Sequence, residues 1–567
     1  MITTKSGKVK PYKEKKKLRP LAEPFVVAPP GATSSKTRIR TTGEELDAVL
    51  DIGMFLGSIA RQDLVTLLHL EAQGMPNCRT ERKQNITGVT SSRWAGGITR
   101  TNLDQYDLAM RNLQSYQATL RSQIRTIEHR LTLPLGPPKK VKKKDKTAST
   151  TDDKQTEGKK KKKIKYGYRD KHEKFYATRK LGRLYGKLAH TTTELTQCRP
   201  SITIGGKGLL KKRHNLTAAN LTEAQWGQKW GAKRMFLTAD GDASQHWGNG
   251  CIWIDPAGHV HLNVPAALVP TYGKELVMST PVEFSHRGGE LRDRICNGGA
   301  ISYVISYEPE KGKLYITASW KIPQPAFLPT PAHLKSLRHL AVDLNGDHLA
   351  AWVVDKHGNP VGAPIYLALN LSGLPAAARD AQVRHVITTL IKIAKEHDCA
   401  AIVIEDLDFV DIRSVGKEQY GKGFRGKKFR KTVLGMPTAK FRDRLVAMCY
   451  TEDLWVIAVD PAYTSKWGKQ HWLKPLQKQQ DARKKQTRTS QATVTGHMAA
   501  AVCVGRRSHG YPLRRKDWSP SVTREMAAGN SGLSNSGVES VVGLTVERKN
   551  LACTTRGIGH MGSDPPL

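Results

Sequence analysis

Acidic residues end three apolar runs in the second half of the chain. Asp343 follows HLAV, Glu405 follows CAAIVI, and Asp460 follows LWVIAV. Short apolar runs between polar segments are typical of buried strands, and the ends of such strands can meet at one edge of a sheet. Carboxylate oxygens are the ligands that Mg²⁺ prefers, and Mg²⁺ assists in-line hydrolysis of phosphodiesters. A single acid at a strand end is ordinarily a solvated terminus, so the hypothesis of a metal site depends on all three.

Strands and helices must alternate to position these acids. The text from His339 predicts three consecutive strands: one ending at Asp343, one over 350–354 and one beginning at Val361. Helices are expected over 376–397 and 437–450, each followed by an apolar strand. This order indicates a mixed α/β sheet. Because Pro461 turns the chain away, we interpret Asp460 as structural.

The stretch from about Leu334 to Arg507 resembles the RuvC nuclease domain, an RNase H-like fold, of type V CRISPR effectors and their TnpB ancestors. AVDLNGD with Asp343 and IVIEDL with Glu405 match the first two acidic motifs. The basic FRGKKFRKT, the helix MPTAKFRDRLVAMCYTE and VIAVDPAYTS are also similar to the family. The resemblance implies that Asp343 and Glu405 are catalytic residues that bind Mg²⁺. It also makes three basic residues candidate nucleic-acid contacts: Lys427, Lys428 and Arg430.

Two positions depart from the family pattern. Where a zinc ribbon would place its first cysteines, the sequence has KWGKQHW, so we expect no zinc. In that segment, Trp467 and Trp472 either hold the fold by packing or stack on bases. In VTGHMAAAVCVGRR, His497 stands where the resemblance places the third catalytic Asp.

Histidine at position 497 would weaken a magnesium site. Its nitrogen suits zinc or iron better than Mg²⁺, and the change removes one negative charge. We therefore expect two-metal cleavage to be impaired, while Asp343 and Glu405 still hold a single Mg²⁺ with waters. The alternative third ligand is Asp481 in KQQDARKK, which lies in a polar segment.

Loss of an acid together with the ribbon is similar to the miniature subtype V-M effectors, which are understood to bind DNA under crRNA guidance and to silence by occlusion. The resemblance implies a multidomain α+β protein with a helical recognition lobe, a β-barrel wedge domain and a RuvC-like domain. The predicted boundaries are 1–20 for an N-terminal arm or first wedge strand, 21–198 for the helical recognition domain with a disordered Lys-rich insert at about 134–166, 199–330 for the wedge β-barrel, 334–462 and 493–510 for the RuvC-like domain, 463–492 for a small target-nucleic-acid-binding insert, and 511–567 for a largely disordered tail.

Composition agrees with a polyanionic partner. The 567 residues include 91 Lys and Arg against 50 Asp and Glu, a net charge of +41. Residues 139–165 hold 13 lysines and 4 acids, which indicates a disordered linker or an electrostatic tether. No apolar run reaches the roughly 18 residues of a membrane span. The first residues lack the apolar core of a secretory signal, and the eight cysteines are widely spaced, so we expect an intracellular protein without disulfides. The resemblance to CRISPR effectors implies that its compartment is the bacterial cytoplasm.

Helical periodicity marks the predicted recognition lobe, over 42–74, 103–131 and 171–195. In the last of these, Arg179, Arg183 and Lys187 form a candidate phosphate-facing ladder. After Pro200 the period changes to two, and 301–322 predicts a hairpin around Pro309–Gly312.

Three hypotheses stay open on the sequence. The first is a monomeric crRNA–protein complex that binds PAM-bearing double-stranded DNA and contributes to antiviral defence, with cleavage weak or absent. Processing of precursor crRNA would accompany it, as in some family members, although no residue of this chain is assigned to that step. The second is an active Mg²⁺-dependent RNA-guided endonuclease, either a type V effector or TnpB-like. The third is a transposon accessory protein that binds nucleic acid without a guide.

Overall fold

A computed structural model describes residues 2–3, 9–10, 20–75, 78–136, 166–407, 424, 427, 438–487 and 493–511. The predicted Lys-rich insert and the C-terminal tail therefore lie almost entirely outside the described residues. The chain divides into two compact units. Unit 1 comprises 1–30, 324–410 and 427–567, and unit 2 comprises 31–323 and 411–426.

Unit 1 is built on a six-stranded sheet in the order β13-β12-β11-β14-β15-β3. The strands are β3 (Phe25–Val26), β11 (Arg338–Leu344), β12 (His348–Val354), β13 (Pro360–Ala368), β14 (Cys399–Glu405) and β15 (Trp455–Val459). β11, β12 and β13 run antiparallel, whereas β11, β14 and β15 run parallel. The predicted strands and the mixed sheet are confirmed, and β3 adds an antiparallel edge strand.

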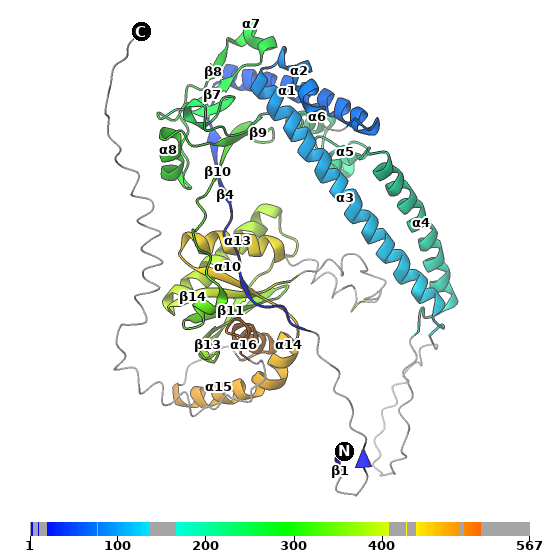
Figure 1. Ribbon diagram of the computed structural model, residues 1–567, viewed down its shortest axis with the longest axis vertical. Helices are drawn as coiled ribbons and strands as arrows, with labels where there is room; N and C mark the ends of the chain where they lie inside the picture. The colour runs from blue at the N-terminus through cyan, green and yellow to red at the C-terminus, as the bar shows by residue number, and fades with distance from the viewer. Residues whose placement is uncertain are drawn as a thin grey trace, which may run out of the picture. The chain divides into compact units, whose positions relative to one another are not determined.

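Helices cover both faces of this sheet (Figure 1). On one face, α10 (Ala376–Glu396) and α13 (Thr438–Thr451) bury Leu390 and Leu445 against Leu340 and Val456. On the other face lies α16 (Gly496–Ser508), whose Gly505 lets the helix approach β12 closely. A Cβ at that glycine would lie 2.6 Å from Val354 Cγ2.

A continuous helical segment packs against α16. It consists of α14 (Thr464–Trp467), a π-helical turn η4 (Gly468–Trp472) and α15 (Leu473–Thr487). Trp472 is 0% exposed and belongs to the same apolar cluster as Trp352 and Val502. The short α9 (Pro331–Leu334) precedes β11, and β1 (Ile2–Thr3) pairs with β2 (Val9–Lys10).

Four helices lie early in unit 2: α1 (Gly43–Ala72), α2 (Arg79–Thr87), α3 (Ser92–Thr132) and α4 (Lys171–Thr196). The periodicity predicted α1, α4 and the part of α3 from residue 103 onward, whereas the short α2 was not predicted. Thr42 and Glu45 form a capping box at the start of α1. α3 and α4 lie side by side as a long hairpin (Figure 1), with Leu120, Ile124, Ile127 and Leu184 buried between them.

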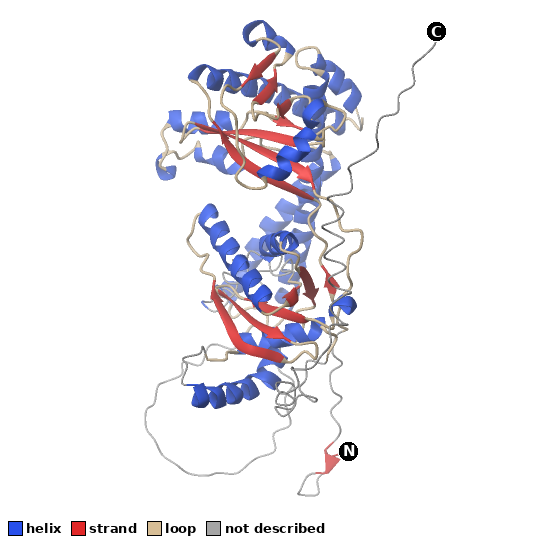
Figure 2. Ribbon diagram, turned by 90° about the vertical axis from the view of Figure 1, so that its left-hand side faces the viewer, coloured by secondary structure: helices blue, strands red, loops and turns tan. Residues whose placement is uncertain are grey.

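The strands of unit 2 form two open sheets (Figure 2). The larger has the order β4-β10-β9-β5, with β4 (Ala32–Ile39), β5 (Thr238–Ala239), β9 (Ser302–Glu308) and β10 (Lys313–Lys321). The smaller is β6 (Ile252–Ile254), β7 (Val260–Asn263) and β8 (Glu275–Val277). The predicted hairpin around Pro309–Gly312 is confirmed as β9–β10.

The expected β-barrel does not close among the described residues. Closure needs an uninterrupted ladder around the ring, and β5 is only two residues long with no strand on its outer side. The opposite edge is β4, from residues that the sequence assigned to the helical lobe. The architecture is therefore a mixed α+β chain with helices and open sheets; the finer boundaries at 198 and 330 stay predictions.

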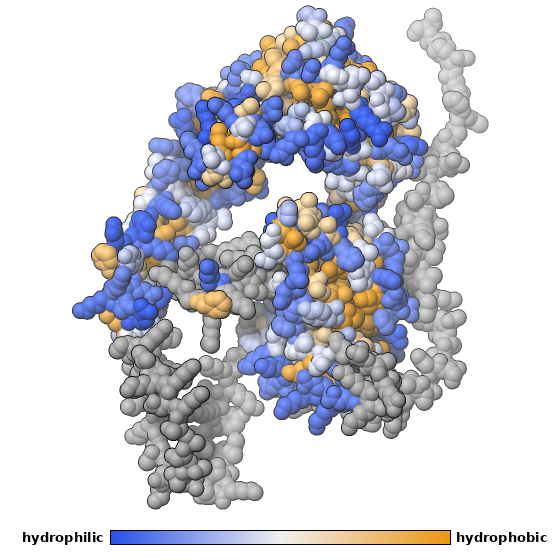
Figure 3. All heavy atoms as spheres, turned by 180° about the vertical axis from the view of Figure 1, so that it is seen from behind, coloured by the Kyte–Doolittle hydropathy of each residue, from blue (hydrophilic) through white to orange (hydrophobic). Residues whose placement is uncertain are grey.

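Shorter helices lie between α4 and β5 and between the strands that follow. They are α5 (Lys207–Lys212), η1 (Thr217–Ala219), α6 (Glu223–Ala232), η2 (His246–Gly248), η3 (Ala266–Leu268), α7 (Val269–Tyr272) and α8 (Gly288–Cys296). Hydrophilic side chains cover most of the face drawn in Figure 3. Of the helices described, none has the length and apolar character that crossing a membrane requires.

Candidate functional site

The predicted acids meet at one edge of the unit 1 sheet. β11 and β14 are parallel neighbours in which Val342 pairs with Ile404, so Asp343 and Glu405 occupy the next step of the ladder. Asp460 follows β15, which pairs in parallel with β14. Asp343 is only 3% exposed. Two carboxylates are thus held close together in a largely water-excluded position, as the sequence predicted.

His497 contacts the first of these acids. Its Nδ1 lies 3.1 Å from Asp343 Oδ2, and α16 presents it from the first turn, where Thr495 caps the helix. Asn345 Nδ2 donates to the same Oδ2 at 2.9 Å. The hydrogen bond to Asp343 raises the pKa of His497 above its usual value, and partial burial opposes this rise. A cationic imidazole is therefore favoured where the resemblance expects a third carboxylate.

The pKa of Glu405 shows that placing these acids close together is unfavourable when they are ionised. Burial, then the nearby charge of Asp343 and that of Asp460, raises its pKa to about 7. The hydroxyl of Thr464 donates to Glu405 Oε1 at 2.5 Å and, with Arg507, acts in the opposite direction. A carboxyl that resists ionisation beside a second carboxylate is typical of functional sites, because a bound cation relieves the repulsion.

The side chain of Asp460 is used in hydrogen bonds to the backbone. Its oxygens accept the backbone N–H groups of Ala462 at 2.8 Å and of Ala22 at 3.0 Å. The guanidinium of Arg507 holds the same turn by donating to the carbonyls of Asp460 and Ala462. These bonds support the interpretation of Asp460 as a residue that fixes the turn, and they bring Thr464 to Glu405.

The two carboxylates fit one hard cation better than two. Within the described ranges, no group of three or more His, Cys, Asp and Glu side chains is arranged to hold a metal. Asp343 and Glu405 supply oxygen ligands that suit Mg²⁺, and waters would complete its coordination. His497 offers a hydrogen-bond donor in place of another oxygen. When bound, Mg²⁺ would polarise a phosphoryl group or activate a water.

The other predicted residues fall into three groups. Lys428 and Arg430 lie outside the described residues, whereas Lys427 is exposed. Arg179, Arg183 and Lys187 are exposed on α4. Asp481 is exposed on α15 and makes no hydrogen bond or ion pair with Asp343 or Glu405 in the part of the chain described.

The two tryptophans of the small insert have different environments. Of the two predicted roles, packing in the fold or stacking on bases, Trp472 has the first, because it is fully buried and cannot reach a base. Trp467 is half-buried, and its ring stacks on Tyr463 with centroids 5.0 Å apart. The segment thus forms part of the apolar layer over α16.

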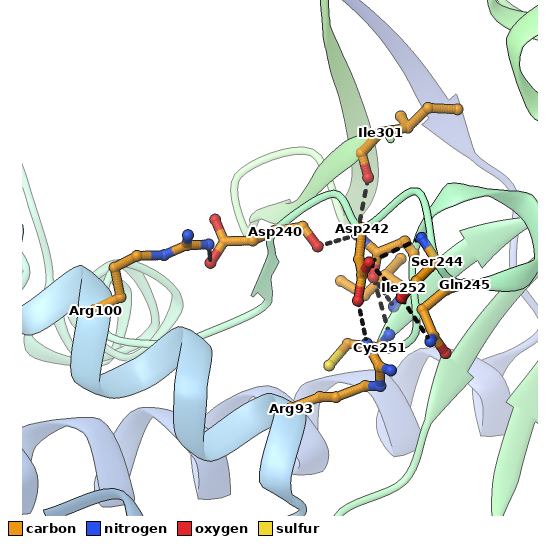
Figure 4. A network of polar contacts seen from close by, with 10 residues as sticks. Arg93, Arg100, Asp240, Asp242, Ser244, Gln245, Cys251, Ile252 and Ile301 are labelled. Carbon is orange, nitrogen blue, oxygen red and sulfur yellow. Dashed lines mark hydrogen bonds and ion pairs between the residues drawn. The ribbon is translucent and has the colours of Figure 1, made fainter. Parts of the chain in front are cut away.

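A polar cleft in unit 2 was not predicted from the sequence. It has a volume of about 550 Å³ and lies between α2, α3 and the segment from Thr238 to Cys251. Arg93 and Arg100 project from α3 toward the acids of that segment (Figure 4): Arg93 Nη1 lies 2.8 Å from Asp242 Oδ2, and Arg100 pairs with Asp240. Hydrogen bonds from Arg93 and Ser244 lower the pKa of Asp242 to about 2.

Two further cations line this cleft. Arg79 and Lys83 lie on α2, and neither has an ion-pair partner among the described residues. The cleft floor includes Gly96 and Gly97, which leave the backbone accessible. The signal in the sequence was weak, because these residues are spread over about 170 positions and only the fold brings them together.

No known protein family matches the chain, and no curated protein was found to be similar to it. The function must therefore be argued from the chain's own residues and their geometry.

Proposed function

We propose that this protein is a crRNA-guided effector that binds PAM-bearing double-stranded DNA and silences by occupying its target. In this proposal the RuvC-like site is impaired for DNA cleavage. His497 contacts Asp343 and occupies the position at which a third acidic residue would complete the metal site. The contact of 3.1 Å between His497 Nδ1 and Asp343 Oδ2 is the observation that carries the proposal.

Charge supports the nucleic-acid partner. The net charge of +41 is spread over both units. In a guided effector the RNA reads the target by base pairing, so the protein itself needs only a basic channel for the strands and a site that recognises the short PAM in the duplex. The cleft of unit 2, with Arg79 and Lys83 at its edge, offers cations that suit a phosphate backbone.

The test is a binding assay with purified full-length protein, crRNA and a matched duplex in millimolar Mg²⁺. We expect an RNA-dependent gel shift without cleavage, and the same shift for Asp343→Ala, because occupancy does not need the acidic site. The net charge of the chain also predicts weaker, RNA-independent binding to any duplex. Binding to the matched duplex that crRNA does not strengthen over an unmatched one would favour the accessory-protein hypothesis instead.

A second candidate function is an active Mg²⁺-dependent guided endonuclease. The adjacent buried carboxylates of Asp343 and Glu405 favour it, since together they can hold one Mg²⁺. Robust cutting by the wild type that Asp343→Ala abolishes would establish this function and contradict the first.

A further inference from the structure

The solvent face of α4 combines aromatic and basic side chains. Six residues form this face, which we call the α4 stripe: His172, Phe175, Tyr176, Arg179, Arg183 and Lys187. Their spacing of three and four places them on one side of the helix. The opposite side, with Ala177 and Leu184, is buried against α3.

The rings of the stripe are unusually accessible. Phe175 is 57% exposed and Tyr176 is 51% exposed. They contact each other edge to face at 5.8 Å, and His172 stacks on Tyr176 at 4.7 Å. The guanidinium carbon of Arg179 lies 5.9 Å from the Phe175 ring centroid. A contiguous aromatic patch left in water on a helix that already has its core marks an interaction surface.

Charge restricts the kind of partner. The stripe contains no acidic side chain, and α4 carries a net charge of +4 from its six Lys and Arg and two Glu. In the part of the chain described, Arg183 and Lys187 have no ion-pair partner. The partner must therefore be anionic and must also present flat faces to the rings. Nucleic acid has both properties where its bases are unpaired, whereas a duplex hides them.

Two glycines flank the stripe in the interior of the helix. Gly182 and Gly186 are exposed, and a Cβ added to either would have no atom within 4 Å. Glycine is unfavourable in a helix interior, and none of the described residues fills the space beside these two. Their position next to Arg183 and Lys187 lets a phosphate chain approach the surface of the helix closely, where the two cations can pair with it.

We infer that the α4 stripe binds single-stranded DNA, with bases stacked on Phe175 and Tyr176 and phosphates paired with Arg179, Arg183 and Lys187. This rests on the proposed function, in which pairing of the guide leaves one target strand without its partner. The rings give affinity for unpaired bases, and the cations give affinity for any phosphate backbone.

Fluorescence anisotropy of the full-length protein with labelled oligodeoxythymidine, and with a duplex of equal length, tests the stripe without a guide RNA. Phe175→Ala/Tyr176→Ala should weaken binding of the single strand about tenfold and leave the duplex unaffected. Arg183→Ala/Lys187→Ala should weaken both and reduce the salt dependence. Two controls on unit 1 should change neither: Phe327→Ala, an exposed ring, and Lys392→Ala, an exposed cation.

Conservative replacement separates stacking from a loss of folding. Phe175→Trp keeps a ring at the position and should keep single-strand affinity, and all variants should retain the wild-type melting temperature. Unchanged single-strand affinity in Phe175→Ala/Tyr176→Ala would overturn the inference, as would an equal loss on duplex. Because the assay contains no guide, failure of RNA-dependent target binding would count against the proposed function and not against the stripe.

Discussion

The imidazole of His497 changes the charge of the site that Asp343 and Glu405 form at the edge of the unit 1 sheet. His497 donates toward Asp343 at 3.1 Å, while the pKa of Glu405, beside Asp343 on the neighbouring strand, is raised to about 7. The sequence predicted that Asp343 and Glu405 would meet, because each ends an apolar strand, and the resemblance to RuvC domains added His497 to the same site. It could not predict the roles of Thr464 and Arg507, which depend on how side chains pack around the turn after β15.

Glu405→Gln should stabilise the protein above neutral pH. The folded pKa of about 7 exceeds the ordinary 4.5, so the native state holds an extra proton between these values and stability falls as pH rises through them. At pH 8 the variant should gain on the order of 2 kcal/mol in metal-free urea denaturation, and the gain should vanish near pH 4. Glu396→Gln, at an exposed position on α10, should show no such gain. Equal behaviour of the two variants would show that burial and repulsion at Glu405 are not the cause.

A buried histidine pair should make unit 1 sensitive to acid. The rings of His339 and His509 stack at 4.1 Å, and burial lowers their pKa values to about 3 and about 4. The unfolded chain therefore binds more protons below its ordinary pKa of about 6.5, and stability is lost as pH falls from there toward 4.

The variant His509→Phe should flatten this acid dependence, because the ring remains while one protonation site is removed. Urea denaturation between pH 7 and pH 4 measures it, with the exposed His385→Phe as control. A wild-type slope in His509→Phe would show that the acid sensitivity arises elsewhere.

Among the elements, helices and strands followed the periodicity closely, while closure of the β-rich region did not. α1 and α4 lie where apolar spacing predicted them, since each buries one face. α3 ends as predicted but begins at Ser92, before the predicted start at residue 103. Alternation identified β9 and β10, but it carries no information on which distant strand completes a sheet. β4 pairs with β10 across more than 270 positions, and the sequence had assigned β4 to a different domain.

The packing of α1, α2 and α3 depends on a buried ion pair. Arg82 Nε lies 2.9 Å from Asp63 Oδ1, both side chains are almost fully buried, and Asn102 donates to Asp63 at 2.8 Å. Arg82→Ala should cost about 3–5 kcal/mol in chemical denaturation, because it leaves the Asp63 carboxylate buried and unpaired. The exposed Arg79→Ala, three residues earlier on α2, should cost under about 0.5 kcal/mol. Similar losses for both would contradict this account of the pair.

For the whole molecule, charge is the dominant property. A net charge of +41 predicts binding to nucleic acid that weakens steeply with salt, with log K falling by about 0.9 per phosphate neutralised for each unit of log salt. A salt titration of duplex binding measures this slope. A flat response would contradict an electrostatic interface.

The most direct test of the central claim is plasmid nicking by His497→Asp. The assay uses purified full-length protein, crRNA, matched target and millimolar Mg²⁺, with wild type and His497→Asp/Asp343→Ala as comparisons. If His497 occupies the position of a missing metal ligand, the wild type shifts the target without cutting, His497→Asp gains nicking, and the double variant loses it again. Robust cutting by the wild type, with no gain in His497→Asp, would contradict the account.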